Sequence, residues 1–204
     1  MPKKEVPIGQ LNDYLPAGTY AAVLEYLRLY KVHLTIARER KSILGDYRHR
    51  TGGDNHRISV NGSLNQWSFL ITLLHELAHL LTFEEFGNRV SAHGREWKLI
   101  YGRLLAQFLQ HKIFPPDIEE ELLRSLKNPA ASSCAEDSLL RVLRRYDGKD
   151  QGRLVEELGD NALFRISDGR IFRKGEKLRK RFKCLEVKTG KMYLFSPVYE
   201  VEEV

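Results

Sequence analysis

A short stretch of this sequence carries the residue types of a metal-dependent hydrolase. Residues 74–97 read LHELAHLLTFEEFGNRVSAHGREW. Residues four apart on an α-helix lie above one another on the same face, so His75 and His79 can both reach one cation. Glu76 follows the first histidine, where its carboxylate can take a proton from water activated by that cation. The HExxH spacing therefore predicts two zinc ligands and a general base on one helical turn.

A third histidine follows soon after the expected end of this helix. Gly87-Asn88 is a typical helix stop, and His93 lies a few residues further on, in HGREW. A short loop can turn the chain back and aim this imidazole at the first two. Three protein ligands with a fourth position open to water are the arrangement of a catalytic zinc site. Other candidates for the third ligand are Glu84, Glu85 and Glu96.

The same helix also admits an interpretation without a metal. Its leucines gather on one side, and His75 and His79 fall nearly opposite them, where they could occupy a solvated face. The histidine side, however, also carries Ile71, Ala78 and Phe83. A helix that is apolar nearly all round is buried on both sides, and buried histidines need polar partners or a metal. This pattern favours the metal site.

The elements around this motif predict an α+β fold. Apolar residues recur at helical spacing over residues 19–30. Residues 32–39, 47–53 and 56–63 alternate and contain β-branched side chains, which predicts a short antiparallel sheet of about three strands. Ser63 or Asn65 can cap the metal helix that follows. A further long helix is expected from His93 or Gly94, and Pro115-Pro116 ends it.

A change in composition near residue 130 predicts a domain boundary. The stretch NPAASS at 128–133 resembles a linker. We expect residues 1–130 to form the metal-binding domain. Residues 131–204 are expected to contain one helix at 134–146 followed by a basic, β-rich unit. Its strand-like segments are ALFRI, RIFRK, KCLEVK and MYLFS.

Composition limits the class of protein. The chain has 204 residues, of which 42% are hydrophobic, enough for a packed core. The richest apolar stretch, residues 67–83, contains His75, Glu76 and His79 and is shorter than a bilayer requires. Cys134 and Cys184 are the two cysteines, far apart and outside any CxxC pair, which fits a reducing compartment. We therefore expect a cytoplasmic protein without a membrane partner.

Basic residues are concentrated in the C-terminal part. Residues 165–191 contain eleven Lys and Arg against three acidic residues. Such a patch can bind the phosphates of DNA, with Phe172, Phe182 and Tyr193 available to stack on bases. The alternative is a solvated face of a small β-unit whose aromatics form a core. The candidate nucleic-acid-binding residues are Arg170, Arg173, Lys174, Lys177, Arg179, Lys180, Arg181 and Lys183.

The sequence resembles a known family over roughly residues 20–128. HELAH followed at this distance by HGREW, with LGDYRHR and RISVNGSL upstream, is similar to the SprT-like metallopeptidases, which include SprT and Spartan. The resemblance implies a zincin-like domain with a central HExxH helix. It implies that His75, His79 and His93 hold one Zn²⁺ and that Glu76 is the base. Many relatives carry a four-cysteine zinc ribbon, which two cysteines cannot form, so the C-terminal unit is a degenerate ribbon without metal or an unrelated unit.

These observations predict a zinc metallopeptidase that cleaves peptide bonds, and the resemblance implies DNA-associated or DNA-crosslinked proteins as substrates. Tyr47, Tyr101, Arg48 and Arg50 are open candidates for stabilising the oxyanion of the tetrahedral intermediate. One alternative is a hydrolase of small amides or esters. Another is a DNA-binding or regulatory protein with little or no peptidase activity. Glu76 argues against the latter, because a purely structural zinc site needs no base.

Overall fold

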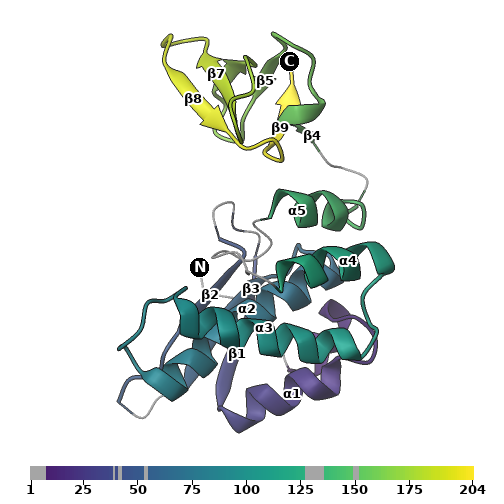
Figure 1. Ribbon diagram of the computed structural model, residues 1–204, viewed down its shortest axis with the longest axis vertical. Helices are drawn as coiled ribbons and strands as arrows, with labels where there is room; N and C mark the ends of the chain where they lie inside the picture. The colour runs from purple at the N-terminus through teal and green to yellow at the C-terminus, as the bar shows by residue number, and fades with distance from the viewer. Residues whose placement is uncertain (1–7, 39, 41–42, 53–54, 127–135, 149–151) are drawn as a thin grey trace. The chain divides into compact units, whose positions relative to one another are not determined.

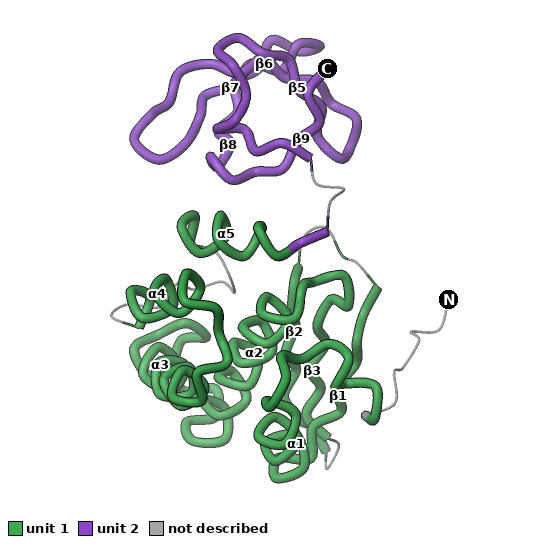
Figure 2. Tube along the Cα trace, turned by 90° about the vertical axis from the view of Figure 1, so that its right-hand side faces the viewer, with its two compact units in different colours: residues 1–146 green, residues 147–204 purple. Residues whose placement is uncertain are grey.

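The structure is a computed structural model that describes residues 8–38, 40, 43–52, 55–126, 136–148 and 152–204. The chain forms two compact units, residues 1–146 (unit 1) and residues 147–204 (unit 2), shown in Figure 1 and Figure 2. Each unit has a hydrophobic core of its own. The HExxH stretch and His93 both lie in unit 1. Helices and small sheets together make the α+β architecture that the sequence predicts.

Unit 1 contains a three-stranded sheet of mixed direction. Its strands β1 (Val32–Ala37), β2 (Gly45–Arg48) and β3 (His56–Asn61) lie in the order β1-β3-β2. β2 and β3 are antiparallel, but β1 runs parallel to β3, so the prediction of an antiparallel sheet is wrong for β1. β3 is the most buried strand, with Ile58 and Val60 inside the core, and it lies between β1 and β2. The chain reverses its direction from β1 to β2 and again from β2 to β3, so β1 and β3 point the same way and pair in parallel.

The helices of unit 1 follow the sequence pattern closely. Asn65 is the residue that caps α2, since its side-chain oxygen accepts a hydrogen bond from the Ser68 N–H at 2.9 Å. Gly87 ends α2 with a φ of 60°, a conformation that glycine adopts at little cost. The helical elements are η1 (Ile8–Tyr14, a 3₁₀ helix), α1 (Tyr20–Leu29), α2 (Gln66–Phe86), α3 (Arg95–Gln110), α4 (Pro116–Ser125) and α5 (Asp137–Arg144).

Helix α2 is the centre of unit 1. It contacts β2, β3 and α3, and its buried residues lie on all sides of the helix. The apolar stripe of α3, which includes Trp97, Leu105 and Phe108, is buried against this core. The arrangement confirms that α2 is covered on both sides. Its histidine side therefore faces protein and a cleft rather than bulk water.

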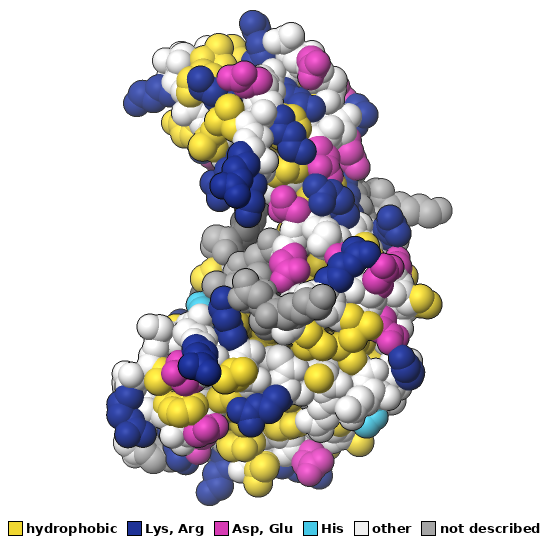
Figure 3. Space-filling model, in the orientation of Figure 1, with side chains coloured by type: hydrophobic (Ala, Val, Ile, Leu, Met, Phe, Trp, Pro, Cys, Tyr) yellow, Lys and Arg dark blue, Asp and Glu magenta, His cyan; other side chains and the backbone are white. Residues whose placement is uncertain are grey.

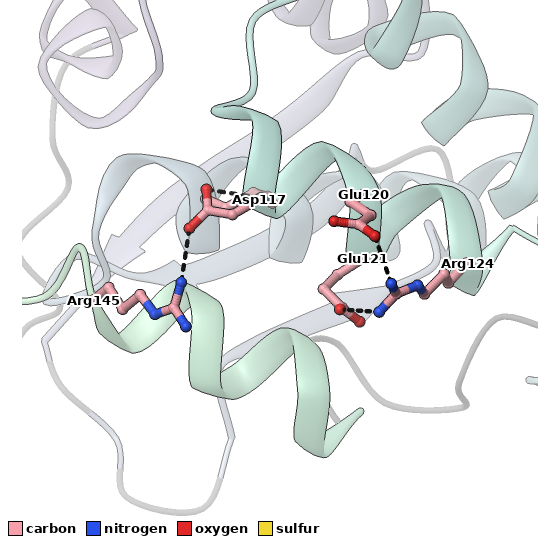
Figure 4. Close-up of polar contacts among 6 residues, drawn as sticks. Asp117, Glu120, Glu121, Arg124 and Arg145 are labelled. Carbon is pink, nitrogen blue, oxygen red and sulfur yellow. Dashed lines mark hydrogen bonds and ion pairs between the residues drawn. The ribbon is translucent and has the colours of Figure 1, made fainter.

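Helix α5 belongs to unit 1. Asn65 donates from Nδ2 to the Leu143 carbonyl at 3.0 Å, which ties α5 to the start of α2. Tyr146 donates its hydroxyl to Asp117 Oδ1 at 2.7 Å, and Arg145 forms an ion pair with Asp117 at 3.4 Å (Figure 4). Because of these contacts the compact units divide after Tyr146. The boundary expected near residue 130 lies outside the described residues.

Unit 2 is a six-stranded sheet of order β4-β9-β5-β6-β7-β8, and it curls around its own aromatic core (Figure 2). The four expected strand segments are confirmed as β5 to β8. β4 and β9 are additional: the glutamate-rich β9 has only Val201 in the core, so its sequence carries little strand signal. Cys184 is buried, and Cys134 lies outside the described residues. The strands are β4 (Arg153–Leu154), β5 (Leu163–Arg165), β6 (Ile171–Arg173), β7 (Phe182–Glu186), β8 (Met192–Phe195) and β9 (Glu200–Glu203).

None of the helices in the described part of the chain combines the length with the apolar character that a bilayer-spanning helix requires.

Candidate metal centre

Helix α2 presents the HExxH residues near its middle. His75 is 4% exposed and Glu76 is 5% exposed, whereas His79, one turn later, is half-buried. The interpretation of a solvated histidine face is therefore wrong for His75. The α2 spacing brings the two imidazoles together, with His79 Nε2 lying 3.2 Å from His75 Nε2.

The third histidine reaches the same point from the other side of the loop that follows α2. The chain turns at Gly87, and His93 lies directly before Gly94, the N-cap residue of α3. His93 Nε2 is 3.3 Å from His75 Nε2. Among the described residues, the group of His75, His79 and His93 has ligand atoms that all lie within 4.8 Å of one another. The structure thus brings together the three predicted ligands.

The spacing of the three nitrogens fits a zinc ion. A tetrahedral zinc ion with bonds of about 2.0–2.1 Å holds two ligand nitrogens about 3.3 Å apart. The two Nε2 separations of 3.2 and 3.3 Å match this edge. Glu84 and Glu85, the alternative ligands on α2, are not part of the group, and neither is Glu96. An imidazole trio with room for a fourth ligand suits zinc chemistry.

The protonation state of the histidines also suits a cation. Burial, followed by the neighbouring His79 and His93, lowers the pKa of His75 to about 3. Burial and His93 lower the pKa of His79 to about 4. Burial and Lys98 lower the pKa of His93. Neutral imidazoles, each with a free lone pair, are the form that binds metals.

Ring packing, rather than a hydrogen bond, orients His75. Its Nδ1 is buried, and none of the described residues forms a hydrogen bond with it. The indole of Trp97 lies against the imidazole with a centroid distance of 4.7 Å, and the Tyr101 ring lies at 5.6 Å. These two α3 side chains therefore fix the direction of the His75 ring. The ring of Tyr101, a candidate oxyanion donor, therefore packs against His75.

Glu76 occupies an unusual electrostatic environment. Burial is the largest cause that raises its pKa, the negative charge of Asp46 adds to it, and Arg40 opposes both, with a resulting value of about 8. The backbone of Gly45 lies against its carboxyl group, since a β carbon at Gly45 would lie 2.5 Å from Glu76 Oε1. A carboxylate with a raised pKa beside a metal site is the property expected of a proton-transferring group.

A cleft of about 620 Å³ opens over these residues. One wall comes from β2 and the segment before it, and the other comes from the loop after α2. Since the imidazoles and the glutamate share this opening, a substrate held there can meet both. The lining residues include Ile43, Leu44, Gly45, Asp46, Tyr47, His75, Glu76, His79, Val90, Ser91, Ala92 and His93.

A hydrogen-bonded chain runs from the cleft wall through the buried His56 to the exposed Glu84. Tyr47 contacts His56 Nδ1 with its hydroxyl at 3.0 Å, and His56 Nε2 lies 3.2 Å from Glu84 Oε1. Because a carboxylate only accepts, His56 donates from Nε2 and accepts the Tyr47 hydroxyl proton at Nδ1. Arg50 pairs with Glu84 at 3.1 Å. The Tyr47 ring lies parallel to His79, with centroids 6.4 Å apart.

Comparison with known proteins assigns the region that contains this site to a protein family. A family model described as the SprT-like family matches residues 19–118. Residues 19–118 belong to the SprT-like family. The SprT-like region begins just before α1 and extends into α4, so it holds the sheet, α2 and all three histidines.

Curated relatives of the SprT-like region share its name. "Protein SprT" of Pectobacterium atrosepticum is 33% identical over 103 residues, which is 45% of this chain and 60% of that protein. "Protein SprT" of Pseudomonas putida is 54% identical over 37 residues, which is 18% of this chain and 23% of that protein. The chain thus spans less than two thirds of the length of these relatives. No solved structure matches the chain significantly.

The predicted nucleic-acid-binding residues lie in unit 2 but differ in their surroundings. Lys174 is 4% exposed and donates from Nζ to the Leu158 carbonyl at 2.5 Å, so it is a structural residue. Arg170 pairs with Asp168 at 2.8 Å. The residues that remain exposed on the loop between β6 and β7 are Lys177, Arg179, Lys180 and Arg181.

Two residues of the site were not singled out from the sequence. Gly45 has no side-chain functional group, and its role is seen only in the close contact of its backbone with Glu76. His56 is 1% exposed and bonds Tyr47 to Glu84. The strand pattern could have indicated His56, because it alternates with the buried Ile58 and Val60 and therefore shares their inward face.

Proposed function

We propose that this protein is a zinc-dependent metallopeptidase with a zincin-like SprT domain. One observation supports this most strongly: three neutral imidazole nitrogens converge at zinc-ligand spacing beside a buried glutamate, in an open cleft. His75, His79 and His93 would hold the ion. Glu76 is not one of the three candidate ligands, so its carboxylate is free to act as a base.

The reaction follows from the groups that face the cleft. A bound zinc ion supplies Lewis acidity and makes water a stronger acid. Glu76 accepts the proton of the water that attacks the peptide carbonyl, and it delivers that proton to the nitrogen of the leaving amine. Its pKa of about 8 applies to the metal-free protein, and a bound cation would lower it, so that the ionised carboxylate can accept the proton and then return it. Tyr47 lines the cleft, so we assign it the polar contact with the substrate carbonyl, to which its hydroxyl proton would turn from His56 Nδ1.

The shape of the site supports a peptide substrate over a small ester. β2 is one of the two outer strands of the described sheet, and residues 43–47, which include most of β2, line the cleft. An outer strand offers unpaired backbone groups, with which an extended peptide can pair. Tyr47, Asp46 and Gly45 would then lie along the substrate.

The decisive experiment separates metal binding from hydrolysis. Purified full-length protein is assayed for zinc content and for casein cleavage. We expect Glu76→Gln to retain zinc and to lose hydrolysis by at least 100-fold, since proton transfer is worth about 10² to 10⁴ in rate. We expect His93→Ala to lose both. Glu85→Gln, on the same helix but outside the metal group, should change neither. Hydrolysis at the wild-type rate by Glu76→Gln would refute the assigned base.

A second proposal concerns the location of substrates. Lys177, Arg179, Lys180 and Arg181 form the loop between β6 and β7, and none of them has an acidic partner among the described residues. Unpaired cations in a cluster attract phosphates. This supports substrates bound or crosslinked to DNA, and it also fits a DNA-binding or regulatory protein with little peptidase activity. Charge reversal at residues 179–181 should abolish salt-sensitive DNA binding, whereas the same change at Lys31 should not.

A further inference from the structure

Unit 2 carries an aliphatic surface on the outward side of its sheet. The pairs Leu163↔Arg173, Arg173↔Leu185 and Leu185↔Met192 form one continuous row across β5, β6, β7 and β8. Lys183↔Leu194 forms the adjacent row. Side chains that face each other across paired strands lie about 5 Å apart, so these rows make one surface. We call it the outer face; its aliphatic members are Leu163, Leu185, Met192 and Leu194.

The outer face is exposed at its β8 end. Of the ten large hydrophobic residues that are exposed in the described chain, six belong to the much smaller unit 2, and two of these six, Met192 and Leu194, lie on the outer face. Leu163 and Leu185 are half-buried. Met192 is 51% exposed and Leu194 is 52% exposed. Single exposed aliphatics are common, but a contiguous group marks a contact surface. Figure 3 shows hydrophobic side chains gathered on unit 2 with Lys and Arg among them.

The charges on the outer face are positive and unpaired. Arg173 and Lys183 lie between the aliphatic residues, and neither forms an ion pair with any residue that the structure describes. The opposite end of the same sheet differs. There the acidic strand β9 runs beside β5, and Arg165 pairs with Glu202 at 3.1 Å. The sheet therefore has one end neutralised by an acidic strand and one end without such a strand.

Strand β8 is the last strand at that open end. Within the described chain it pairs with β7 alone. An outer strand with unpaired backbone groups can accept a further strand from another molecule. Such a strand would extend the outer face beside Met192 and Leu194.

We propose that the β8 edge and the outer face bind an extended segment of a partner protein in which every second residue faces the outer face, and in which these residues are aliphatic and acidic in turn. Its aliphatic side chains would cover Met192 and Leu194, and its carboxylates would meet Lys183, which lies beside Leu194 on the same face. Within the chain, Glu202 of β9 meets Arg165 of the neighbouring strand β5 in this way, with an ion pair of 3.1 Å. Nucleic acid fits this face less well, because its exposed members are aliphatic and offer no rings for base stacking.

The test uses the full chain and a defined probe. A fluorescein-labelled peptide of about ten residues with the repeat Val-Thr-Glu-Thr is titrated, so that Val and Glu share one face of the strand. Binding is followed by fluorescence anisotropy. We expect saturable binding, weakened at least tenfold by Leu194→Asp and by Lys183→Glu. The matched control is Leu99→Asp, which alters an α3 residue that is 55% exposed in unit 1. That control should bind the peptide like the wild type.

Three results would overturn the proposal. The first is no binding of this peptide, or equal binding of a peptide of the same length with Lys in place of Glu. The second is equal binding of a peptide with alternate backbone nitrogens methylated, since this removes the strand hydrogen bonds. The third is a preference for a ten-nucleotide thymidine strand that Leu194→Asp abolishes. Thermal unfolding of each variant confirms its fold, and Lys183→Glu decides the outcome if Leu194→Asp fails to fold.

Discussion

Gly45 of β2 lies in direct contact with the carboxyl group of Glu76 on α2. A β carbon at position 45 would lie 2.5 Å from Glu76 Oε1 and 2.8 Å from its Cγ. Both distances are far below van der Waals contact. The backbone of β2 therefore packs against the candidate base, and only glycine permits this approach. The relationship explains why a residue without functional groups lines the cleft.

The first prediction follows from this contact. Gly45→Ala should push the Glu76 carboxyl away from its position and lower the rate of casein cleavage at least tenfold, because proton transfer depends on geometry to within about 0.5 Å. Zinc content should remain unchanged, since the histidines are untouched. The measurement is hydrolysis together with metal analysis. Gly102→Ala on α3, where an added β carbon meets nothing within 4 Å, is the control. Equal activity of both variants would contradict the positioning role.

The second prediction concerns Tyr47. Its hydroxyl lies in the cleft wall and bonds to His56, so Tyr47→Phe removes the polar contact but keeps the ring beside His79. We expect a loss of about tenfold to 1000-fold in kcat, the range for one group that contacts the reacting oxygen. Zinc content should not change. Tyr199→Phe in unit 2 is the matched control, since Tyr199 is 40% exposed and lies outside the cleft lining. A fall in zinc content, or an unchanged kcat, would show that Tyr47 does not act on the reacting oxygen.

Several features of the site were predictable because they are local. His75 and His79 lie on the same face of any regular α-helix because they are four residues apart. The start of α2 at Asn65 and its end at Gly87 follow from the known preferences of these residue types for helix ends. His93 was within reach because the loop before α3 is short. In each case the relevant residues lie close together in the chain. Periodicity and capping therefore decide where they point.

Features that depend on distant packing were not predictable. The parallel pairing of β1 with β3 depends on which strand is central, and hairpin signals do not determine this. The contact of Gly45 with Glu76 joins elements about thirty residues apart. Lys174 looked like a phosphate-binding residue in a basic run, yet it is buried. Sequence shows the charge of such a residue but not the carbonyls that surround it.

The third prediction is a pH effect on the metal-free protein. Glu76 has a pKa of about 8 when folded, above its unfolded value of about 4.5, so its contribution is lost as pH rises through 8. His75 and His79, with pKa values of about 3 and 4, lie below their unfolded value. Their contribution is therefore lost as pH falls below about 6.5. Stability should decline on both sides of a maximum near pH 6.

Substituting Glu76 separates the two limbs of this profile. In EDTA, Glu76→Gln should abolish the alkaline decline, which is worth about 2 kcal/mol between pH 6 and 8, and leave the acid limb intact. The measurement is the free energy of unfolding from urea titrations at pH 5, 6 and 8. Glu85→Gln serves as the control. Parallel pH profiles for wild type and Glu76→Gln would show that Glu76 does not titrate in this way.

The fourth prediction concerns the buried lysine of unit 2. Lys174 Nζ donates to the Leu158 carbonyl at 2.5 Å and lies 4.5 Å from the centre of the Phe182 ring. Lys174→Met keeps the side-chain volume but leaves that carbonyl without its donor. Unit 2 should lose about 1–3 kcal/mol, the cost of an unsatisfied buried group. Hydrogen exchange of the unit 2 amides measures this loss. Lys177→Met, on an exposed position of the same loop, should leave the exchange unchanged, and equal effects of the two substitutions would contradict a structural role for Lys174.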